Sequence, residues 1–322
     1  MRVLNLVTSP ESRFFKQQVE TLSRRGIDSE TVAVPGSRCQ TDDETTTRSV
    51  GDYLRFYPKV LSSVGPFDIV HANYGLTAPA ALAQPTRPVV VSLWGSDLMG
   101  RYGSLSRWCA RQADAVIVMS DEMASMLDVD CHVIPHGVDL ERFKPEPQAA
   151  ARDRVGWTRE GTHVLFPYPV ERRVKNYPRA KRVVDAAKAR IDGDVELHTL
   201  YGVPHRRMPD YMNAADALLL TSRREGSPNS VKEALACNLP IVSTDVGDVR
   251  ERVDGVDRSF VCRSDEELIE ALVEVCRPPG PSTGRRKAQE VSLETMGERI
   301  EGLYASVLTN RRGDRQGNTV PG

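Results

Sequence analysis

Two carboxylates with a fixed spacing mark the stretch of this sequence that is most able to do chemistry. Glu225 lies in a polar segment after the apolar run 217–220, and Glu233 lies eight residues later in a helix-like segment. Between them, Ser227 and Pro228 are typical of a helix start, because serine caps a free backbone N–H and proline lacks an N–H that the first turn cannot use. A carboxylate accepts two hydrogen bonds side by side, which suits the vicinal diol of a ribose, and free N–H groups at a helix start favour phosphate. The pattern favours a nucleotide-sugar site, and the alternative is an ordinary crossover helix with two solvated acids.

The neighbouring segments predict how these two acids are positioned. The apolar run 217–220 and the segment 240–244 are typical of buried strands. The helix between them has an apolar inward face, formed by Val231, Ala234 and Leu235. Strand, loop, helix and strand in this order place the loop of Glu225 at the carboxyl end of a parallel sheet, where α/β proteins bind their ligands.

The same alternation of strand-like and helix-like segments runs through both halves of the 322-residue chain. It predicts an α/β fold of two facing Rossmann-like domains with a cleft between them. A proline-containing linker begins at residue 145, so we expect an N-terminal domain at 1–144 and a C-terminal domain at 145–290. An amphipathic helix at 291–309 follows, and the polar, glycine-rich tail at 310–322 is expected to be disordered.

Composition argues against several classes of protein. A net charge of −1 gives no overall field that would attract nucleic acid or an anionic membrane. The six cysteines lack zinc or redox spacing, so a reduced, cytoplasmic protein is expected. No apolar run approaches the ~18 residues of a membrane span, and no signal-like segment precedes the first strand. Neither half has G-x-G-x-x-G after its first strand or a Walker A motif, which argues against a dehydrogenase or a P-loop enzyme.

The segment from Glu225 to Glu251 resembles the Glu-x7-Glu signature of family 4 retaining glycosyltransferases, which have the GT-B fold. Positions of the family wording that this chain matches are Glu225, Gly226, Pro228, Glu233, Ala234, Ala236, Pro240 and Gly247. The chain departs at Asn238 and Asp248, where glycine is usual. The first departure is mild, because asparagine tolerates the left-handed conformation at a helix end.

The resemblance implies roles for the two acids and for the residues between them. Glu233 would bind the ribose hydroxyls of a nucleoside-diphosphate sugar, and Glu225 would contact the donor sugar. Backbone amides around Gly226 and Ser227 would bind the sugar and the phosphate. The further donor-binding positions of this segment are Pro228, Asn229 and Ser230.

A compact basic group of Arg172, Arg173 and Lys175 follows the first strand of the second half. It corresponds to a family region with an arginine and a lysine around the donor diphosphate, although the family spacing is longer. Cations at a strand end offset the charge that develops on a departing diphosphate. We predict that Arg172 and Lys175 are catalytic and that Arg173 binds the donor, with a solvated basic loop as the alternative. Tyr201 and His205 follow the next strand, near the expected position of a base or sugar.

The first half departs from the family more than the second half does. Residues 68–75 and 94–97 resemble the family's D-I-V-H-A-H-Y-G and H-G-S-D, but Trp94 replaces the histidine that lies by the reactive sugar. Tryptophan can stack on a sugar ring, but it cannot accept a proton. His71 either faces the cleft or lies buried against a backbone carbonyl. The Gly-Gly that often follows the first strand is replaced by Ser-Pro-Glu-Ser at residues 9–12.

The junction of the two halves also resembles a family motif. His136-Gly-Val-Asp corresponds to N-G-V-D-x-x-x-F, with His136 in place of asparagine and Gly137 as a hinge or a point of close approach. In GT-B proteins the last helix packs back on the first domain, which the helix at 291–309 fits. The predicted acceptor and cleft residues are His71, Trp94, Gly95, Asp97, His136 and Gly137.

These features predict a retaining hexosyltransferase that uses a nucleoside-diphosphate sugar and a sugar, lipid-linked or small-molecule acceptor. No cofactor is expected, and no Asp-x-Asp motif stands where a metal-dependent transferase would need it, so transfer is predicted to be metal-independent. No nucleic-acid partner is expected, and peripheral contact with the cytoplasmic membrane face is left open. The alternatives are a nucleotide-sugar epimerase or hydrolase on the same scaffold, and a catalytically degenerate GT-B protein that binds without transferring.

Overall fold

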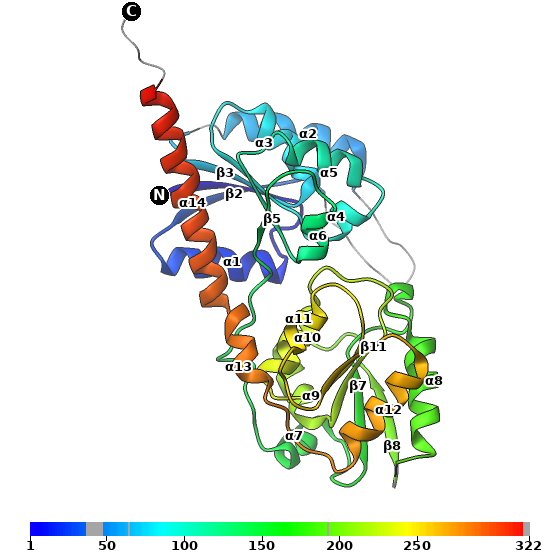
Figure 1. Ribbon diagram of the computed structural model, residues 1–322. Helices are drawn as coiled ribbons and strands as arrows, with labels where there is room; N and C mark the ends of the chain where they lie inside the picture. The colour runs from blue at the N-terminus through cyan, green and yellow to red at the C-terminus, as the bar shows by residue number, and fades with distance from the viewer. Residues whose placement is uncertain (37–47, 64, 192, 318–322) are drawn as a thin grey trace, which may run out of the picture. The chain divides into compact units, whose positions relative to one another are not determined.

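The computed structural model of the chain describes residues 1–36, 48–63, 65–191 and 193–317. The structure divides into two units, each an α/β arrangement with one parallel sheet (Figure 1). Unit 1 comprises Met1–Gly137 and Leu293–Gly322, and unit 2 comprises Val138–Ser292. The divisions predicted from the sequence, 144/145 and 290/291, lie a few residues from those of the structure.

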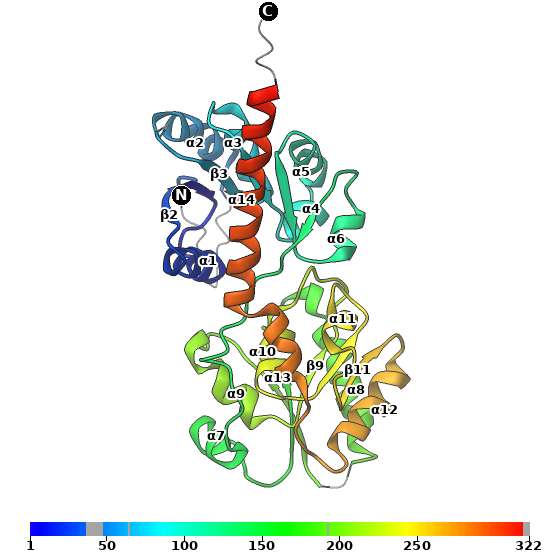
Figure 2. The same ribbon diagram turned by 60° about the vertical axis from the view of Figure 1, so that its left-hand side comes forward.

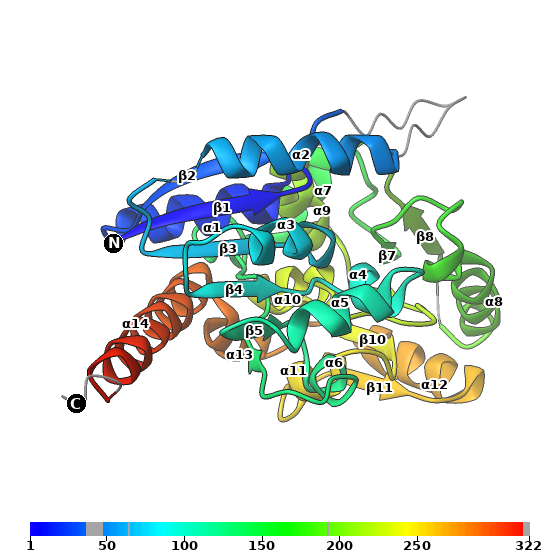
Figure 3. The same cartoon turned by 90° about the horizontal axis from the view of Figure 1, so that it is seen from above.

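Unit 1 contains a six-stranded sheet in the order β2-β1-β3-β4-β5-β6, with all neighbouring strands parallel. Figure 3 shows most of this succession from above. Its central strands are buried along their whole length, as in the run Val-Val-Val-Ser of β4, because helices cover both faces of a parallel sheet. The strands are β1 (Arg2–Val7), β2 (Asp28–Ala33), β3 (Ile69–Asn73), β4 (Val89–Ser92), β5 (Ala115–Val118) and β6 (His132–Val133).

Helices cover the two faces of the unit 1 sheet. On one face α14 (Leu293–Gly317) lies along α1 (Arg13–Arg24), as Figure 2 shows. The α14 side chains in the core recur at helical spacing and include Met296, Ile300 and Tyr304. The other face carries α2 (Val50–Ser62), α3 (Ala78–Ala83) and α5 (Gly103–Ala110) (Figure 1). The remaining short helices are η1 (Gly75–Thr77), α4 (Ser96–Met99) and α6 (Asp121–Ser125).

Unit 2 contains a five-stranded parallel sheet in the order β11-β10-β9-β7-β8. The strands are β7 (Thr162–Phe166), β8 (Val195–Thr199), β9 (Ala217–Leu220), β10 (Ile241–Thr244) and β11 (Ser259–Cys262). Both sheets therefore confirm the predicted parallel α/β architecture. No helix in the described ranges is both long and apolar enough to cross a bilayer.

Two groups of helices pack on the unit 2 sheet. On one side α8 (Tyr177–Lys188) contacts α12 (Asp265–Cys276). On the other side α7 (Gln148–Val155) contacts α9 (Met208–Ala214), and α10 (Asn229–Ala236) contacts α13 (Gly284–Ala288) (Figure 1). The short elements are η2 (Arg173–Lys175), η3 (His205–Arg207), α11 (Val249–Val253) and η4 (Gln289–Val291).

The structure corrects two local predictions. Helix α10 begins at Asn229, with Pro228 at the capping position and no side-chain cap, so Ser227 is not the N-cap. The hydroxyl of Ser227 instead donates to the Asp248 carboxylate, at 2.7 Å. Helix α14 continues to Gly317, past the predicted helix end at 309, because Arg and Gln are good helix formers and extending an existing helix needs no new nucleus. The rest of the predicted tail, 318–322, lies outside the described residues.

Candidate functional site

The loop between β9 and α10 places Glu225 at the carboxyl end of the unit 2 sheet. The Glu225 side chain is only 14% exposed, and Oε1 accepts hydrogen bonds from Lys175 Nζ at 2.5 Å and from Ser222 Oγ at 2.6 Å. Lys175 comes from η2, the loop after β7, and its side chain is 6% exposed. The structure thus joins two of the three predicted catalytic residues in one nearly buried ion pair.

Tyr168 completes this cluster and was missed by the sequence analysis. The Lys175 ammonium lies 3.9 Å from the centroid of the Tyr168 ring, a cation–π contact. The Tyr168 hydroxyl shares a short hydrogen bond with Ser230 Oγ, which ties the β7 end to the first turn of α10. Burial raises the pKa of Tyr168, and the negative charge of Glu225 raises it further. Tyr168 lies two residues after β7, and this position at the carboxyl end of a parallel strand could have identified it as a candidate site residue.

Burial also lowers the pKa of Lys175, although the charge of Glu225 opposes this effect. An ammonium that has lost its water gains from any further anion placed beside it, because the interaction is screened less than in solvent. Arg172 adds positive charge nearby and is a smaller cause of the lowered pKa of Lys175. The side chains of Arg172 and Arg173 are exposed. The loop therefore offers one desolvated cation with two exposed cations beside it in the chain.

Glu233 lies in α10 and is paired with a residue that was not among the predicted site residues. Its Oε1 accepts a hydrogen bond from His205 Nε2 at 2.8 Å, and the carboxylate is nearly buried. The other ring nitrogen, His205 Nδ1, is buried without a hydrogen-bond partner among the described residues. The sequence placed His205 only in the general region of a base or sugar. The pairing joins His205 and Glu233 across 28 residues, so no local sequence pattern could predict it.

The turn after β10 presses directly on the Gly226 backbone. Gly247 has φ +55°, and a Cβ at this position would lie 2.5 Å from the Gly226 carbonyl oxygen. Next to it, the buried carboxylate of Asp248 accepts from Ser227 and from Arg252 Nε, the latter at 2.8 Å. Asp248, which departs from the family glycine, therefore fixes the loop that carries Glu225.

In unit 1, His71 is not at the surface, which corrects its assignment as an acceptor or cleft residue. It is 0% exposed and hydrogen-bonded through Nδ1 to Tyr304 OH at 2.6 Å and through Nε2 to Ser92 Oγ at 2.7 Å. Burial lowers the pKa of His71 to about 3. The alternative of a core histidine holds, with two hydroxyls as partners rather than a backbone carbonyl. The central strands are buried on both faces and therefore show no alternation of polar and apolar residues. The burial of His71 could not be predicted from such a pattern.

Other predicted unit 1 residues do come together. Trp94 is half-buried and meets His136 edge to face at 4.8 Å between ring centroids, and Phe14 stacks on the His136 ring at 4.7 Å. The Arg13 guanidinium lies over Phe14. Trp94 Nε1 has no hydrogen-bond partner among the described residues. This aromatic stack of Phe14, His136 and Trp94 was not predicted as a unit, because the three residues are far apart in sequence.

Asp97 and its neighbours act through the backbone. The Asp97 carboxylate accepts from the backbone N–H groups of Gly75, Trp94 and Gly95, at 2.8 to 2.9 Å. Burial raises the pKa of Asp97 against the opposing effect of these bonds. Asp97 therefore holds the Trp94 segment in place instead of facing a substrate. Gly137 donates its N–H to the Met296 sulfur, and its predicted role as a hinge remains a prediction.

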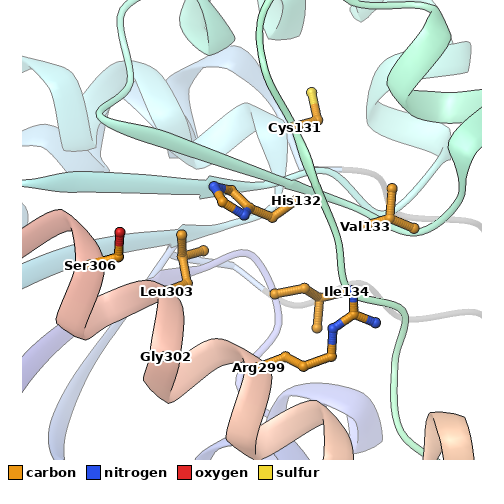
Figure 4. A pocket seen from close by; sticks show the side chains of 8 residues that line it. All are labelled: Cys131, His132, Val133, Ile134, Arg299, Gly302, Leu303 and Ser306. Atoms are coloured by element: carbon orange, nitrogen blue, oxygen red, sulfur yellow. The ribbon is translucent and has the colours of Figure 1, made fainter.

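A separate groove in unit 1 contains none of the predicted residues. It has a volume of about 550 Å³ and lies between the edge strand β6 and α14 (Figure 4). Its lining is Cys131, His132, Val133, Ile134, Arg299, Gly302, Leu303 and Ser306.

Comparison with known proteins agrees with this arrangement. The family model described as Glycosyltransferase Family 4 matches residues 12–142, and the model described as Glycosyl transferases group 1 matches residues 176–277. A Bacillus subtilis glycosyltransferase named for teichuronic acid biosynthesis is 28% identical over 211 residues, which are 56% of this chain and 54% of the relative. The chain thus spans about half the length of that relative.

Two further likenesses cover more of the chain. The GDP-mannose-dependent alpha-(1-6)-phosphatidylinositol monomannoside mannosyltransferase of Mycolicibacterium smegmatis is 27% identical over 258 residues, 65% of this chain and 68% of the relative. The solved structure of Anabaena HepE in complex with UDP-glucose aligns with a TM-score of 0.71 and 17% identity, over 95% of this chain and 100% of that chain.

The two parallel α/β units place the chain in the GT-B fold class, which it shares with the solved structure of HepE. Within that class, the two family models match segments in both units. The chain belongs to glycosyltransferase family 4.

Proposed function

We propose that this protein transfers a hexose from a nucleoside-diphosphate sugar to a carbohydrate, lipid-linked or small-molecule acceptor, with retention at the anomeric carbon and without a catalytic metal. The observation that carries the proposal is the nearly buried pair of Lys175 and Glu225 at the carboxyl end of the unit 2 sheet. Similar proteins support the donor class, since one relative is GDP-mannose-dependent and one solved structure holds UDP-glucose.

The donor would bind through complementary charge. Lys175 would meet the diphosphate, where its desolvated ammonium would stabilise the charge that grows as the phosphate leaves. Arg172 is the better candidate for a second diphosphate contact, because its charge acts on both Lys175 and Tyr168. Arg173 would make an outer donor contact.

Glu225 and Glu233 would hold the two ends of the donor. Glu225 is oriented by Ser222 and Lys175 and would accept hydrogen bonds from the hexose hydroxyls. Glu233 would accept from the ribose 2′ and 3′ hydroxyls, with its carboxylate oriented by His205. Backbone amides from Gly226 to Ser230 would approach the sugar and the phosphate.

The acceptor would be recognised by residues of unit 1. Trp94 offers an aromatic face to a sugar ring, but no proton acceptor. The proton of the attacking hydroxyl would therefore pass to the departing phosphate oxygen as the new glycosidic bond forms on the same face of the sugar. A lipid-linked acceptor would bring the protein to a membrane surface.

A titration series followed by product analysis tests this proposal. GDP, UDP, GDP-mannose and UDP-glucose are titrated calorimetrically, and products are then identified by mass spectrometry with and without acceptor sugars, in buffer containing EDTA. Nucleotide binding and acceptor-dependent transfer in EDTA are expected, with anomeric configuration checked by NMR. Acceptor-independent hydrolysis or epimerisation would favour the enzyme alternative, and binding without turnover would favour a degenerate protein. Absence of binding by every nucleotide would overturn the proposal.

A further inference from the structure

A cluster of metal-ligating side chains lies on the β7–β8 side of unit 2, outside the donor site. It consists of His163 on β7 with Glu196 and His198 on β8, and it is the one such group among the described residues. The parallel register pairs His163 with Glu196, and side chains two residues apart on a strand share a face. The three side chains therefore converge on one face of two neighbouring strands.

The distances fit a small transition-metal ion. His163 Nδ1 lies 2.8 Å from His198 Nε2, and His198 Nε2 lies 3.4 Å from Glu196 Oε2. All three ligand atoms lie within 4.8 Å of one another. Tetrahedral ligands at zinc distances of ~2.0–2.1 Å are separated by about 3.3 Å, which lies between the two observed spacings. Separating the two imidazoles by about half an ångström is enough to admit such an ion.

The surroundings prepare the two imidazoles as ligands. His163 Nε2 donates to the Thr158 carbonyl oxygen at 3.0 Å, so the free lone pair of a neutral His163 ring is at Nδ1, which faces His198. Donation of the distal N–H to a carbonyl is the usual way in which a metal-binding histidine is oriented. His198 Nε2 faces both His163 Nδ1 and Glu196 Oε2, so the His198 ring presents this nitrogen to the centre of the cluster.

The three side chains differ in burial, and this difference leaves access for an ion. His163 is 1% exposed and Glu196 is exposed, so the cluster opens toward solvent on the carboxylate side. The Trp157 ring stacks on His198 at 3.6 Å between centroids and on His163 at 5.1 Å, and covers the imidazoles. The two imidazole ligands are therefore covered by Trp157 on one side and open to solvent on the side of Glu196.

We propose that His163, His198 and Glu196 bind one divalent transition-metal ion of the zinc class, with water in the remaining coordination position. The ion would join the edge strand β8 to β7 and stabilise unit 2. The cluster shares no residue with the donor site, so this inference does not depend on the proposed function and leaves metal-independent transfer unchanged.

The test is a calorimetric titration of Zn²⁺ into the tag-free, EDTA-stripped full chain at pH 7.5. One saturable site per chain is expected in the wild type. We expect His198→Gln and Glu196→Gln to weaken it by about 100-fold and about 10-fold respectively. The matched control is His132→Gln, which removes an exposed histidine on β6 of unit 1 and should leave the affinity unchanged.

Two further readouts keep the test decisive if a variant folds poorly. Free Zn²⁺ at 100 times its Kd should raise the Tm of the wild type by about 5–10 °C, and should not raise that of His198→Gln. Co²⁺ should quench the fluorescence of Trp157 in the wild type, and this quenching should vanish in Trp157→Phe. Equal Zn²⁺ affinity in wild type and His198→Gln, or no saturable binding, would overturn the proposal and identify the cluster as a hydrogen-bonded histidine pair.

Discussion

The candidate residues of the two units are held by different kinds of interaction. In unit 2, ionic and polar pairs connect segments that are far apart in sequence: Lys175 with Glu225, His205 with Glu233, and Ser227 with Asp248. In unit 1, Asp97 holds the backbone of the Trp94 segment, and the partly buried side chains of Phe14, His136 and Trp94 form an aromatic stack. Unit 2 is suited to an anion with hydroxyls, whereas unit 1 is suited to the face of a ring. The contrast teaches that the family motif marks the half whose candidate residues form charged pairs, while the candidate residues of the departing half are held by backbone hydrogen bonds and ring contacts.

The largest effect is expected from Glu225→Gln. The substitution keeps the side-chain shape and an oxygen that can accept from Ser222, but removes the charge opposite Lys175. We expect transfer to fall by at least about 100-fold, the scale of a lost electrostatic contact in an active site. Nucleotide binding should persist, which calorimetry with the nucleoside diphosphate checks.

The matched control for that substitution is Glu171→Gln, which neutralises an exposed acid beside Arg172. Its transfer rate should equal that of the wild type. Wild-type turnover in Glu225→Gln would show that the charged loop of unit 2 is structural and would remove the main contrast between the units.

The next effect is expected from Gly247→Ala. The new Cβ would collide with the Gly226 carbonyl, and alanine is strained at φ +55°. The free energy of unfolding should fall by about 2–4 kcal/mol, from strain and overpacking together. Urea unfolding measures it, and a raised KM for the donor should accompany it because the Glu225 loop is displaced.

Gly255→Ala is the control for backbone strain alone. Gly255 has φ +69°, but a Cβ there meets no atom within 4 Å. It should cost about 1–2 kcal/mol, the strain of a left-handed alanine, and leave the donor KM unchanged. If the two variants matched in both stability and KM, the contact between Gly247 and Gly226 would have no role.

A smaller, pH-dependent effect is expected in unit 1. The pKa of His71 is about 3 in the folded protein and 6.5 when unperturbed, so the unfolded chain binds the proton first. Stability from the neutral ring is complete above about pH 6.5 and is lost as the pH falls toward 3, by up to about 1.4 kcal/mol per pH unit. His71→Gln should flatten this dependence.

The measurement is urea unfolding from pH 7 to pH 4 in a Trp157→Phe background, where the remaining tryptophans, Trp94 and Trp108, report on unit 1. The exposed His132 serves as the comparison through His132→Gln, which should keep the wild-type slope. Identical slopes in the wild type and His71→Gln would show that the buried ring of His71 is charged or solvated.

Much of the architecture was accessible from the sequence, because it depends on local patterns. The strand, loop, helix and strand around Glu225 were predicted, and Asn238 ends its helix with φ +55° as expected. The start of α10 was predicted wrongly, because the hydroxyl of Ser227 is used by a residue 21 positions away. The pairs that orient the candidate site link distant positions, so only the folded chain brings them together. The burial of His71 was hidden for a related reason, since a strand covered on both faces shows no alternation.

The smallest effect is expected from Trp94, and it bears most directly on the aromatic character of unit 1. Trp94→Ala removes the half-buried ring that meets His136, but keeps the bond to the Asp97 carboxylate, because that bond is donated by the backbone N–H of residue 94. If the ring stacks on an acceptor sugar, the acceptor KM should rise by about 5- to 10-fold, the scale of about 1 kcal/mol for an aromatic contact, while the donor KM stays constant. Trp94→Phe should recover part of the loss, because an aromatic face remains.

Trp108→Ala, which removes an exposed tryptophan on α5, should alter neither constant. Initial rates with acceptor and donor varied in turn separate the two constants. A rise in the donor KM with an unchanged acceptor KM would assign Trp94 to donor binding. It would contradict the proposal that unit 2 binds the donor and unit 1 binds the acceptor.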